Sequence, residues 1–335
     1  MDDRSKEVGL VVTRTPLRIS FAGGGTDMPD FYLKHSGAVL STTINKYLYV
    51  TIKRHGGLYD ESYRLNYSTT EQAGRLDDIE NDIARECFRL LQVEPPIYMS
   101  TVADLPGLSG LGSSSSFAVG LLHALHAFAG ERVSPGQLAE EAARVEIEIL
   151  ESPIGKQDHY AAAFGGLSHF QFQSDGQVAI EPQHLPKGQL ESLFDQILLF
   201  WTGIWRNSSS VLAEQKLNSD RNVESLLIMR DHAQELRGII QNGFTPERLG
   251  KVLDAGWNIK KKLASGISNS KIDDWYQKAR KAGASGGKLC GAGGGGFMLI
   301  VAAPECHDAV RRALSDMTEV AVEYEAQGSK LMLAE

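Results

Sequence analysis

The stretch PGLSGLGSSSSFAVG, residues 106–120, says more about the fold of this 335-residue chain than any other segment. Three glycines lead into four consecutive serines, Ser113 to Ser116, and an apolar run from Phe117 to Phe128 follows. This order predicts a flexible loop that opens directly into a buried helix. The first turn of a helix has unpaired N–H groups and the positive end of the helix dipole. We therefore expect the loop to bind the phosphates of a nucleotide.

Serines at this position could also serve only as a helix cap after a glycine-rich loop. A cap requires one serine, and four in succession favour a phosphate site in which hydroxyls add donors or magnesium ligands. Two further glycine clusters support that interpretation. AGGGTD at 22–27 follows a predicted strand, and GAGGGG at 291–296 lies between two predicted strands.

The cluster at 291–296 matches the G-x-G-x-x-G pattern of dinucleotide-binding folds. Those folds need a helix directly after the glycines, whereas Phe297–Val301 has the composition of a strand. No glycine loop of the sequence ends in Gly-Lys-Ser or Gly-Lys-Thr, so the Walker pattern does not apply either. The remaining interpretation is a phosphate site built from several glycine loops.

Composition narrows the class of partner. The net charge of −8 argues against nucleic acid as the main partner, because a phosphate backbone attracts basic surfaces. Lys260–Lys262 is the only tight basic run, and we expect its side chains to spread over different helix faces and to be solvated. The N-terminal segment MDDRSKEVGL has no long apolar core, so we expect no secretory signal. The apolar stretch Phe297–Ala303 is too short to cross a membrane.

Three cysteines, Cys87, Cys290 and Cys306, are scattered at spacings that fit no zinc site. An odd number of isolated cysteines is typical of free thiols in a reducing compartment. We therefore expect a cytoplasmic protein without a membrane partner.

Strand and helix patterns follow one another without the regular repeat of a βαβ fold. Branched and aromatic residues predict strands at 9–24, 37–55, 97–102, 167–172 and 197–203, and a strand, glycine loop and strand at 288–303. Helical spacing predicts helices at about 77–92, 117–128, 135–152, 209–218, 222–241, 246–263 and 275–282. These patterns predict an α+β fold with a β-rich N-terminal half and a helical C-terminal half, joined near residues 174–190.

Three segments together resemble a known family. RTPLRISFAGGGTD (14–27), PGLSGLGSSSS (106–116) and KLCGAGGGGF (288–297) are similar to the three ordered motifs of the GHMP small-molecule kinases, which include galactokinase, homoserine kinase and mevalonate kinase. TTINKY (42–47) and GKQDHYAAAFGG (155–166) further resemble the sugar 1-kinase branch that acts on D-glycero-D-manno-heptose 7-phosphate. The resemblance implies a ribosomal-protein-S5-like domain at 8–180 and a ferredoxin-like domain at 181–335, with the active site between them.

The resemblance also implies roles for individual residues. Asp158 would accept or orient the proton of the attacking hydroxyl, although it could also simply cap the helix at Tyr160–Phe164, and Arg18 would stabilise the transferring phosphoryl group. Ser114 and Glu146 would hold magnesium, with Glu148 and Glu151 as alternatives to Glu146. The residues implied for ATP are Gly110, Leu111, Gly112, Ser113, Ser114, Ser115 and Ser116. Those implied for the acceptor are Gly24, Gly25, Thr26, Asp27, Lys156, Gly293 and Gly294.

One departure bears on the acceptor. Galactokinase has Glu-His where this chain has Gly24-Gly25, which argues against galactose and makes room for a bulkier sugar. A heptose phosphate would need cations for its own phosphate, and Arg14, Lys46, Arg64 and Arg206 are the candidates.

The activity that the resemblance implies is ATP- and Mg²⁺-dependent phosphorylation of the anomeric hydroxyl of the heptose 7-phosphate. The 1,7-bisphosphate product would serve the synthesis of nucleotide-activated heptose for lipopolysaccharide or capsule. Alternatives are a fucose- or galactose-type sugar 1-kinase, a decarboxylase that uses ATP transiently, and a sugar sensor without turnover. A homodimer is compatible with the resemblance.

Overall fold

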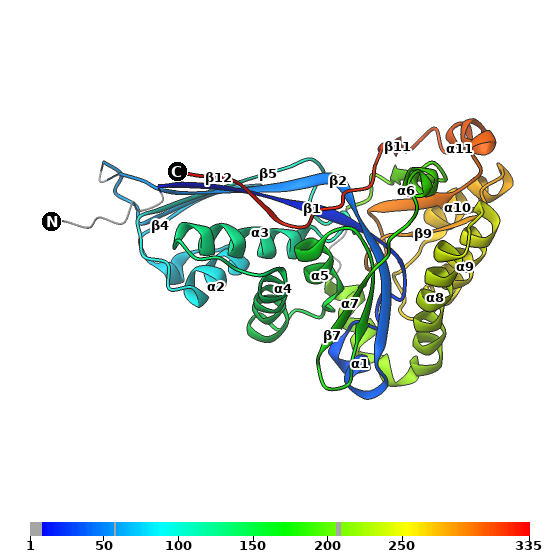
Figure 1. Cartoon of the computed structure of the whole chain (residues 1–335), viewed down its shortest axis with the longest axis horizontal. Helices are drawn as coiled ribbons and strands as arrows, with labels where there is room; N and C mark the ends of the chain where they lie inside the picture. Colours follow the sequence, from blue (N-terminus) through cyan, green and yellow to red (C-terminus); the bar gives the residue numbers. More distant parts are fainter. Residues whose placement is uncertain (1–8, 57, 206–208) are drawn as a thin grey trace.

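A computed structural model describes residues 9–56, 58–205 and 209–335. In the described part of the chain, eight strands form one large sheet whose main path runs β12-β1-β2-β5-β3-β4, while β6 pairs with β2 and β7 pairs with β6 (Figure 1). All of these pairs are antiparallel except β3 with β5. The strands are β1 (Leu10–Ala22), β2 (Gly37–Arg54), β3 (Tyr63–Asn66), β4 (Thr70–Ala73), β5 (Ile97–Ala103), β6 (Leu167–Phe172), β7 (Val178–Pro182) and β12 (Lys330–Ala334).

Four helices cover one face of this sheet (Figure 1). They are α2 (Asp82–Leu90), α3 (Ser113–Phe128), α4 (Pro135–Ala143), which continues as a π-helical turn over Arg144–Ile149, and α5 (Gln157–Phe164). The predicted buried helix is α3, whose apolar residues lie in one core with those of β2 and β5. A helix that is apolar on all sides is stable only when other elements surround it, so α3 anchors the serine loop to the centre of the sheet.

A second sheet of four antiparallel strands in the described residues has the order β11-β8-β10-β9. Its strands are β8 (Ile197–Trp201), β9 (Gly286–Leu289), β10 (Phe297–Val301) and β11 (Thr318–Glu319). The helices of this half are α6 (Gln189–Phe194), α7 (Ser209–Leu217), α8 (Val223–Gln241), α9 (Pro246–Lys260), α10 (Ser270–Lys281) and α11 (His307–Ala313), and α1 (Pro29–His35) lies between β1 and β2 in the chain.

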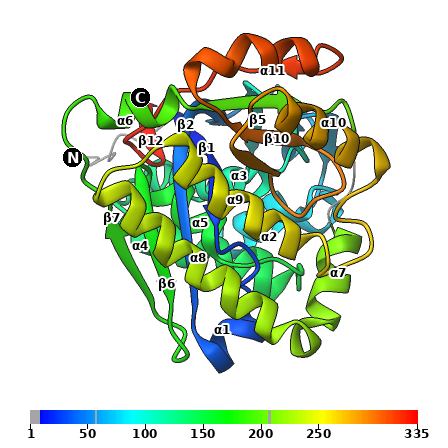
Figure 2. The same ribbon diagram turned by 90° about the vertical axis from the view of Figure 1, so that its right-hand side faces the viewer.

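The helix pair α8 and α9 joins the two sheets. The two helices lie side by side in Figure 2, with α8 packed against β1 and β2 and α9 packed against β9. One hydrophobic core accordingly contains Leu17 and Ile19 from β1, Leu236 from α8 and Phe297 from β10. The α+β class is thus confirmed, and the two sheets share a packed boundary.

The pairing of the last strand, β12, crosses the predicted division of the chain into domains at 8–180 and 181–335. β12 pairs with β1, with Val11 opposite Ala334 and Arg14 opposite Lys330. Because residues 330–334 belong to the first sheet, a single cut in the chain does not separate the two sheets.

One predicted helix boundary changes for a local reason. The helix expected from about residue 77 begins at Asp82, because the Asn81 side chain accepts a hydrogen bond from the Ala84 N–H and caps it. Residues Leu76–Asp78 form a separate 3₁₀ turn.

None of the helices in the described ranges combines the length and apolar character that a bilayer-spanning segment requires.

Candidate active site

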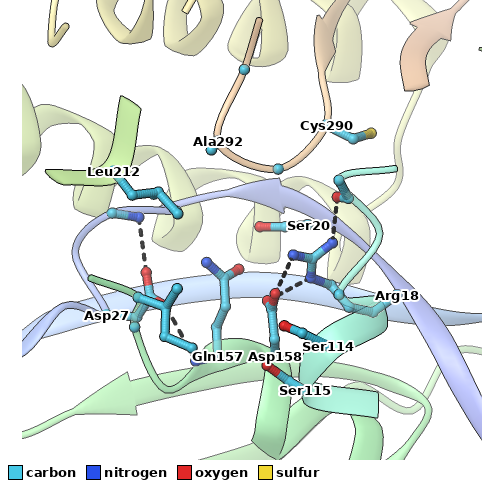
Figure 3. A pocket seen from close by; sticks show the side chains of 18 of the residues that line it. Arg18, Ser20, Asp27, Ser114, Ser115, Gln157, Asp158, Leu212, Cys290 and Ala292 are labelled. Carbon is cyan, nitrogen blue, oxygen red and sulfur yellow. Dashed lines mark hydrogen bonds and ion pairs between the residues drawn. The ribbon is translucent and has the colours of Figure 1, made fainter. Parts of the chain in front are cut away.

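Several segments that lie far apart in the sequence meet around one cleft (Figure 3). They are residues 18–28 from β1 and the turn after it, the serine loop at 108–115, residues 154–158, and the third glycine loop at 290–295. The cleft holds about 1070 Å³, including the part that opens to solvent.

The serine loop reaches the cleft through glycine conformations. Gly110 and Gly112 have φ of 82° and 78°, and Gly112 is the residue that precedes the first turn of α3. A Cβ at Gly112 would lie 3.3 Å from Asp158 Oδ2, so the absence of a side chain lets the catalytic candidate approach the helix start. Ser113, Ser114 and Ser115 line the cleft beside it.

Leu111 and Ser116 are also expected to bind ATP, but in the structure they stabilise the serine loop through hydrogen bonds to β1. The Leu111 carbonyl accepts a hydrogen bond of 3.0 Å from the Arg18 N–H, and the Ser116 hydroxyl donates to the Pro16 carbonyl at 2.9 Å. Both residues are buried and lie outside the set of described residues that line the cleft. Their contacts fix the serine loop to β1, which also presents Arg18.

The serine loop and the third glycine loop touch through their backbones. A Cβ at Gly110 would lie 2.7 Å from the Cys290 carbonyl oxygen, and one at Gly291 would lie 2.5 Å from the Gly110 Cα. Gly293 lines the cleft, whereas the Gly294 N–H donates to the Ile267 carbonyl at 2.8 Å and holds the loop in place.

Asp158 and Arg18 form a two-point ion pair inside the cleft (Figure 3). Arg18 donates from Nε to Asp158 Oδ1 at 2.7 Å and from Nη2 to Oδ2 at 2.6 Å, and its Nη1 donates to the Gly110 carbonyl at 2.8 Å. Asp158 lies in the first turn of α5 but its side chain does not cap that helix. The guanidinium therefore fixes the carboxylate directly beside the start of α3.

Asp27 forms a second acidic position, on the left in Figure 3. Its Oδ1 accepts from the Gly25 N–H at 2.8 Å and its Oδ2 from the Gln157 N–H at 3.2 Å. Burial and then the nearby Asp158 charge raise the pKa of Asp27. A Cβ at Gly155 would overlap the Asp27 carboxylate, so this tight arrangement requires glycine there.

Gly24 and Gly25 line the cleft beside Asp27, while Thr26 does not. The buried Thr26 hydroxyl donates to the Gly23 carbonyl at 2.8 Å and closes the turn. Two further polar atoms, Ser20 Oγ and Gln157 Oε1, line the cleft, are buried, and have no hydrogen-bond partner among the described residues. An unpaired buried polar atom is costly, so these two atoms mark a surface that suits the hydroxyls of a ligand.

Two of the predicted site residues point elsewhere. Lys156 Nζ pairs with Glu140 Oε2 at 2.9 Å, and only its backbone N–H reaches Asp27, with a bond of 3.1 Å to the carbonyl. The Glu146 carboxylate is buried and shares a hydrogen bond of 2.8 Å with His159 Nε2. Neither residue is among the described residues that line the cleft. Glu146 lies on the π-helical turn and His159 follows Asp158 on α5, so their side chains meet between the helices.

The donor set of the cleft fits magnesium only in part. Ser113 and Ser114 offer hydroxyl oxygens at the start of α3, and Mg²⁺ in such sites takes its other ligands from water and substrate phosphates. The described residues contain no group of three acidic, His or Cys side chains that could hold a metal by themselves. The serine part of the predicted magnesium site therefore fits, and the predicted partner Glu146 does not.

Two buried lysines complete the cleft, and the interpretation of Lys260 as a solvated residue was wrong. Lys260 and Lys288 are each only 7% exposed, whereas Lys262 is exposed. Lys260 Nζ donates to the Gly291 carbonyl, and Lys288 Nζ donates to the Ser20 and Phe21 carbonyls at 2.8 and 3.2 Å. Burial lowers the pKa of Lys260 to about 8 and that of Lys288 to about 7, and the Lys260 charge further lowers the latter.

Of the cations predicted for the acceptor phosphate, the three that the structure describes do not line the cleft. Arg14 pairs with Glu325 at 3.4 Å, and Arg64 pairs with Glu61 at 2.5 Å. Lys46, like these two, is not among the described lining residues, and Arg206 falls outside the described residues.

The site combines a helix that begins with serines, glycine loops that meet around a cleft, and a carboxylate held by arginine. This combination is typical of a kinase that acts on small molecules. Two family models match the chain: "GHMP kinases N terminal domain" over residues 81–166 and "GHMP kinases C terminal" over residues 240–320. The chain belongs to the GHMP kinases. It is an ATP-dependent sugar kinase of that family.

Individual relatives agree with this assignment. The chain is 31% identical over 304 residues to the D-glycero-alpha-D-manno-heptose 7-phosphate kinase of Campylobacter jejuni, covering 87% of this chain and 89% of that protein. It is 27% identical over 350 residues to the L-fucokinase/L-fucose-1-P guanylyltransferase of Bacteroides fragilis, covering 92% of this chain and 36% of that protein. The crystal structure of a D-glycero-D-manno-heptose 1-phosphate kinase from Bacteroides thetaiotaomicron has the same fold, with a TM-score of 0.79 and 24% identity over 96% of this chain and 99% of that one.

Proposed function

We propose that the protein transfers the γ-phosphoryl group of ATP to the anomeric hydroxyl of D-glycero-D-manno-heptose 7-phosphate. The observation that carries the proposal is the placement of the Arg18–Asp158 pair between the serine loop on one side and Asp27 with unpaired polar atoms on the other. The first side suits the phosphates of a donor, and the second suits the hydroxyls of a sugar. The similarity to the C. jejuni heptose 7-phosphate kinase supports the choice of heptose.

The donor site consists of the serine loop and the first turn of α3. Free N–H groups and the positive helix end attract the phosphates of ATP. Ser113 and Ser114 would hold the Mg²⁺ that neutralises the phosphate charge. The glycine conformations at Gly110 and Gly112 let the phosphates approach the backbone.

Asp158 orients the attacking hydroxyl and accepts its proton. Each Asp158 oxygen accepts one hydrogen bond from Arg18 and retains a second lone pair for the hydroxyl of the sugar. As the sugar oxygen bonds to the γ-phosphorus, the bond from that phosphorus to the β–γ bridging oxygen breaks and ADP leaves. Arg18 uses three of its five N–H donors in its bonds to Asp158 and Gly110, and the other two can stabilise the charge that develops on the transferring phosphoryl group.

Asp27, Ser20 and Gln157 hold the sugar. The three polar groups surround the Gly24–Gly25 turn, where a Cβ at Gly24 would approach Gln157 Nε2 to 3.4 Å and Ser20 Oγ to 3.6 Å. Glycine at both positions leaves the turn without side chains, which gives a seven-carbon sugar more room than Glu-His would.

An ADP-release assay with a panel of acceptors tests the proposal. Heptose 7-phosphate should give the highest kcat/KM among heptose 7-phosphate, fucose, galactose, mannose and mevalonate, and phosphorus NMR should place the new phosphate at C1. A higher kcat/KM with fucose would assign the chain to the fucose-type kinases, to which the B. fragilis relative points. Release of carbon dioxide, or nucleotide binding without turnover on any acceptor, would instead indicate a decarboxylase or a sensor.

A further inference from the structure

Lys260 and Lys288 form a buried pair of lysines, and neither makes an ion pair with a carboxylate of the described residues. Among the described residues, no carboxylate lies within ion-pair distance of either ammonium group, and both groups bind only backbone carbonyls. Lys260 uses one of its three N–H donors in this way and Lys288 uses two. Burying a charge without a counter-ion is strongly unfavourable, so the pair points to an anion that binds from outside.

A side cavity opens next to the two lysines and extends the cleft. It is lined by Phe21, Ala22 and Gly23 before the acceptor turn, by Met229 and His232 of α8, by Val252, Leu253, Gly256 and Trp257 of α9, and by both lysines. Lys260 and Lys288 line the cleft as well, so the two spaces are adjacent. The side cavity is too small to hold a phosphate by itself, so a phosphate beside the two ammonium groups would lie where this cavity joins the cleft.

Two more polar atoms in the wall of this cavity have no partner. Trp257 is 1% exposed, and its Nε1 donor has no hydrogen-bond acceptor among the described residues. His232 Nδ1 is likewise buried and unpaired in the described part of the chain. An indole N–H can only donate a hydrogen bond, so the cavity combines two ammonium groups with a donor that needs an acceptor.

We propose that Lys260, Lys288, Trp257 and His232 bind the phosphate group that the acceptor sugar already carries. This inference rests on the proposed function and names the residues that distinguish a sugar phosphate from a free sugar. The free N–H groups of the two lysines and the indole N–H supply donors to the phosphate oxygens, and a bound dianion favours the protonated form of both lysines.

The position of the lysines favours the acceptor over the donor. Lys288 donates to the carbonyls of Ser20 and Phe21, which directly precede the turn that carries Asp27. The donor phosphates belong at the serine loop, which the side cavity does not include. A sugar whose hydroxyls bind Asp27 can therefore place its far end towards the lysine pair while its anomeric hydroxyl faces Asp158.

Steady-state kinetics of Lys260→Met test the specificity role, with Lys262→Met as a matched control at an exposed position two residues away. Lys260→Met should raise the KM for heptose 7-phosphate by about tenfold or more, because a charge-assisted hydrogen bond contributes roughly that factor. The KM for ATP should not change, and the kcat/KM for heptose without the phosphate should fall much less than the kcat/KM for heptose 7-phosphate. An increase in the KM for ATP, or an equal loss with both sugars, would overturn the proposal. Lys288→Met provides the same test if Lys260→Met does not fold.

A binding measurement without turnover separates this inference from the proposed function. Inorganic phosphate should shift the indole N–H signal of Trp257 in a ¹H–¹⁵N spectrum, with Trp257→Phe used to assign that signal. The shift should disappear in Lys260→Met and persist in Lys262→Met. If the signal moves but heptose 7-phosphate is not a substrate, the proposed function fails and the anion site stands. If heptose 7-phosphate is turned over and phosphate leaves the signal of Trp257 unmoved, the anion site is wrong.

Discussion

Arg18 of β1 holds Asp158 of α5 with two parallel hydrogen bonds, from Nε to Oδ1 at 2.7 Å and from Nη2 to Oδ2 at 2.6 Å. The two residues are 140 positions apart, and the third donor of the guanidinium binds the Gly110 carbonyl at 2.8 Å. A single side chain thus connects the proton acceptor to the loop that holds the donor phosphates. The relative position of the two reaction partners depends on this contact.

Replacement of Asp158 tests the proton-acceptor role. Asp158→Asn should lower kcat by about 10²- to 10⁴-fold, because the amide cannot accept the hydroxyl proton. The KM for ATP should stay unchanged, since the serine loop remains in place. Initial rates of ADP release measure both constants, and Asp175→Asn, at an exposed position, serves as the control. A normal kcat in Asp158→Asn would remove this residue from the mechanism.

Alanine variants of two glycines with the same backbone conformation distinguish the effect of backbone strain from the effect of crowding in the site. Gly112 and Gly130 have φ of 78° and 77°, but a Cβ at Gly130 meets nothing within 4 Å, whereas one at Gly112 meets Arg18 and Asp158. Both alanine variants should lose about 1 kcal/mol of stability because L-residues disfavour this conformation. Only Gly112→Ala should also lose most of its kcat/KM. Thermal unfolding and ADP release give the two readouts, and equal activity of the two variants would contradict the expectation.

The metal ligands are tested by two variants with opposite expected results. Ser114→Ala should raise the Mg²⁺ concentration needed for half-maximal activity, because the hydroxyl lies at the start of α3. Glu146→Gln should leave that concentration unchanged and lower the unfolding temperature, since it weakens a buried hydrogen bond to His159 that contributes about 1–3 kcal/mol. A higher Mg²⁺ requirement in Glu146→Gln would show that this side chain turns into the cleft during the reaction.

The buried lysines predict how stability depends on pH. The pKa of Lys288 is about 7 in the fold and about 10.4 in an unfolded chain, so between these values the unfolded chain binds more protons. The free energy of unfolding of the wild type should therefore rise with pH in this window. Each unit of difference in pKa corresponds to about 1.4 kcal/mol.

Lys288→Met removes this titration. The free energy of unfolding of Lys288→Met minus that of the wild type should therefore be smaller at pH 10 than at pH 7. Denaturant unfolding in a non-phosphate buffer across this range measures the difference. Lys262→Met should show the pH dependence of the wild type, because Lys262 is exposed. Parallel curves for the wild type and Lys288→Met would contradict the lowered pKa.

The sequence predicts the parts of the site that rest on local patterns. The serine loop, α3 and the strand β6 at 167–172 follow from residue order and from helical or alternating spacing. The α+β class follows from the irregular succession of these elements. Asp158 and Arg18 are predicted by resemblance of their motifs, whereas their pairing depends on how β1 and α5 pack.

Lys260, Lys288, Ser20 and Gln157 carry no such local pattern. A lysine in a basic run at the end of a helix is exposed in most proteins, whereas Lys260 is buried where α9 packs on β9 and its ammonium group donates to the Gly291 carbonyl. The orientation of Glu146 towards His159 also depends on the turn between α4 and α5, which includes a π-helical segment that periodicity does not predict. These features are set by tertiary contacts, and one sequence does not specify them.

The backbone contact between Gly110 and Gly291 has a consequence for how this enzyme can diverge. A Cβ on either residue would overlap the facing loop, and the atoms it would meet belong to the backbone, which no substitution can make smaller. A substitution at one position therefore cannot be rescued by a substitution at the other. Homologues should therefore keep both glycines. Methods that detect contacts from correlated substitutions should find no signal between these two positions, although their backbones touch.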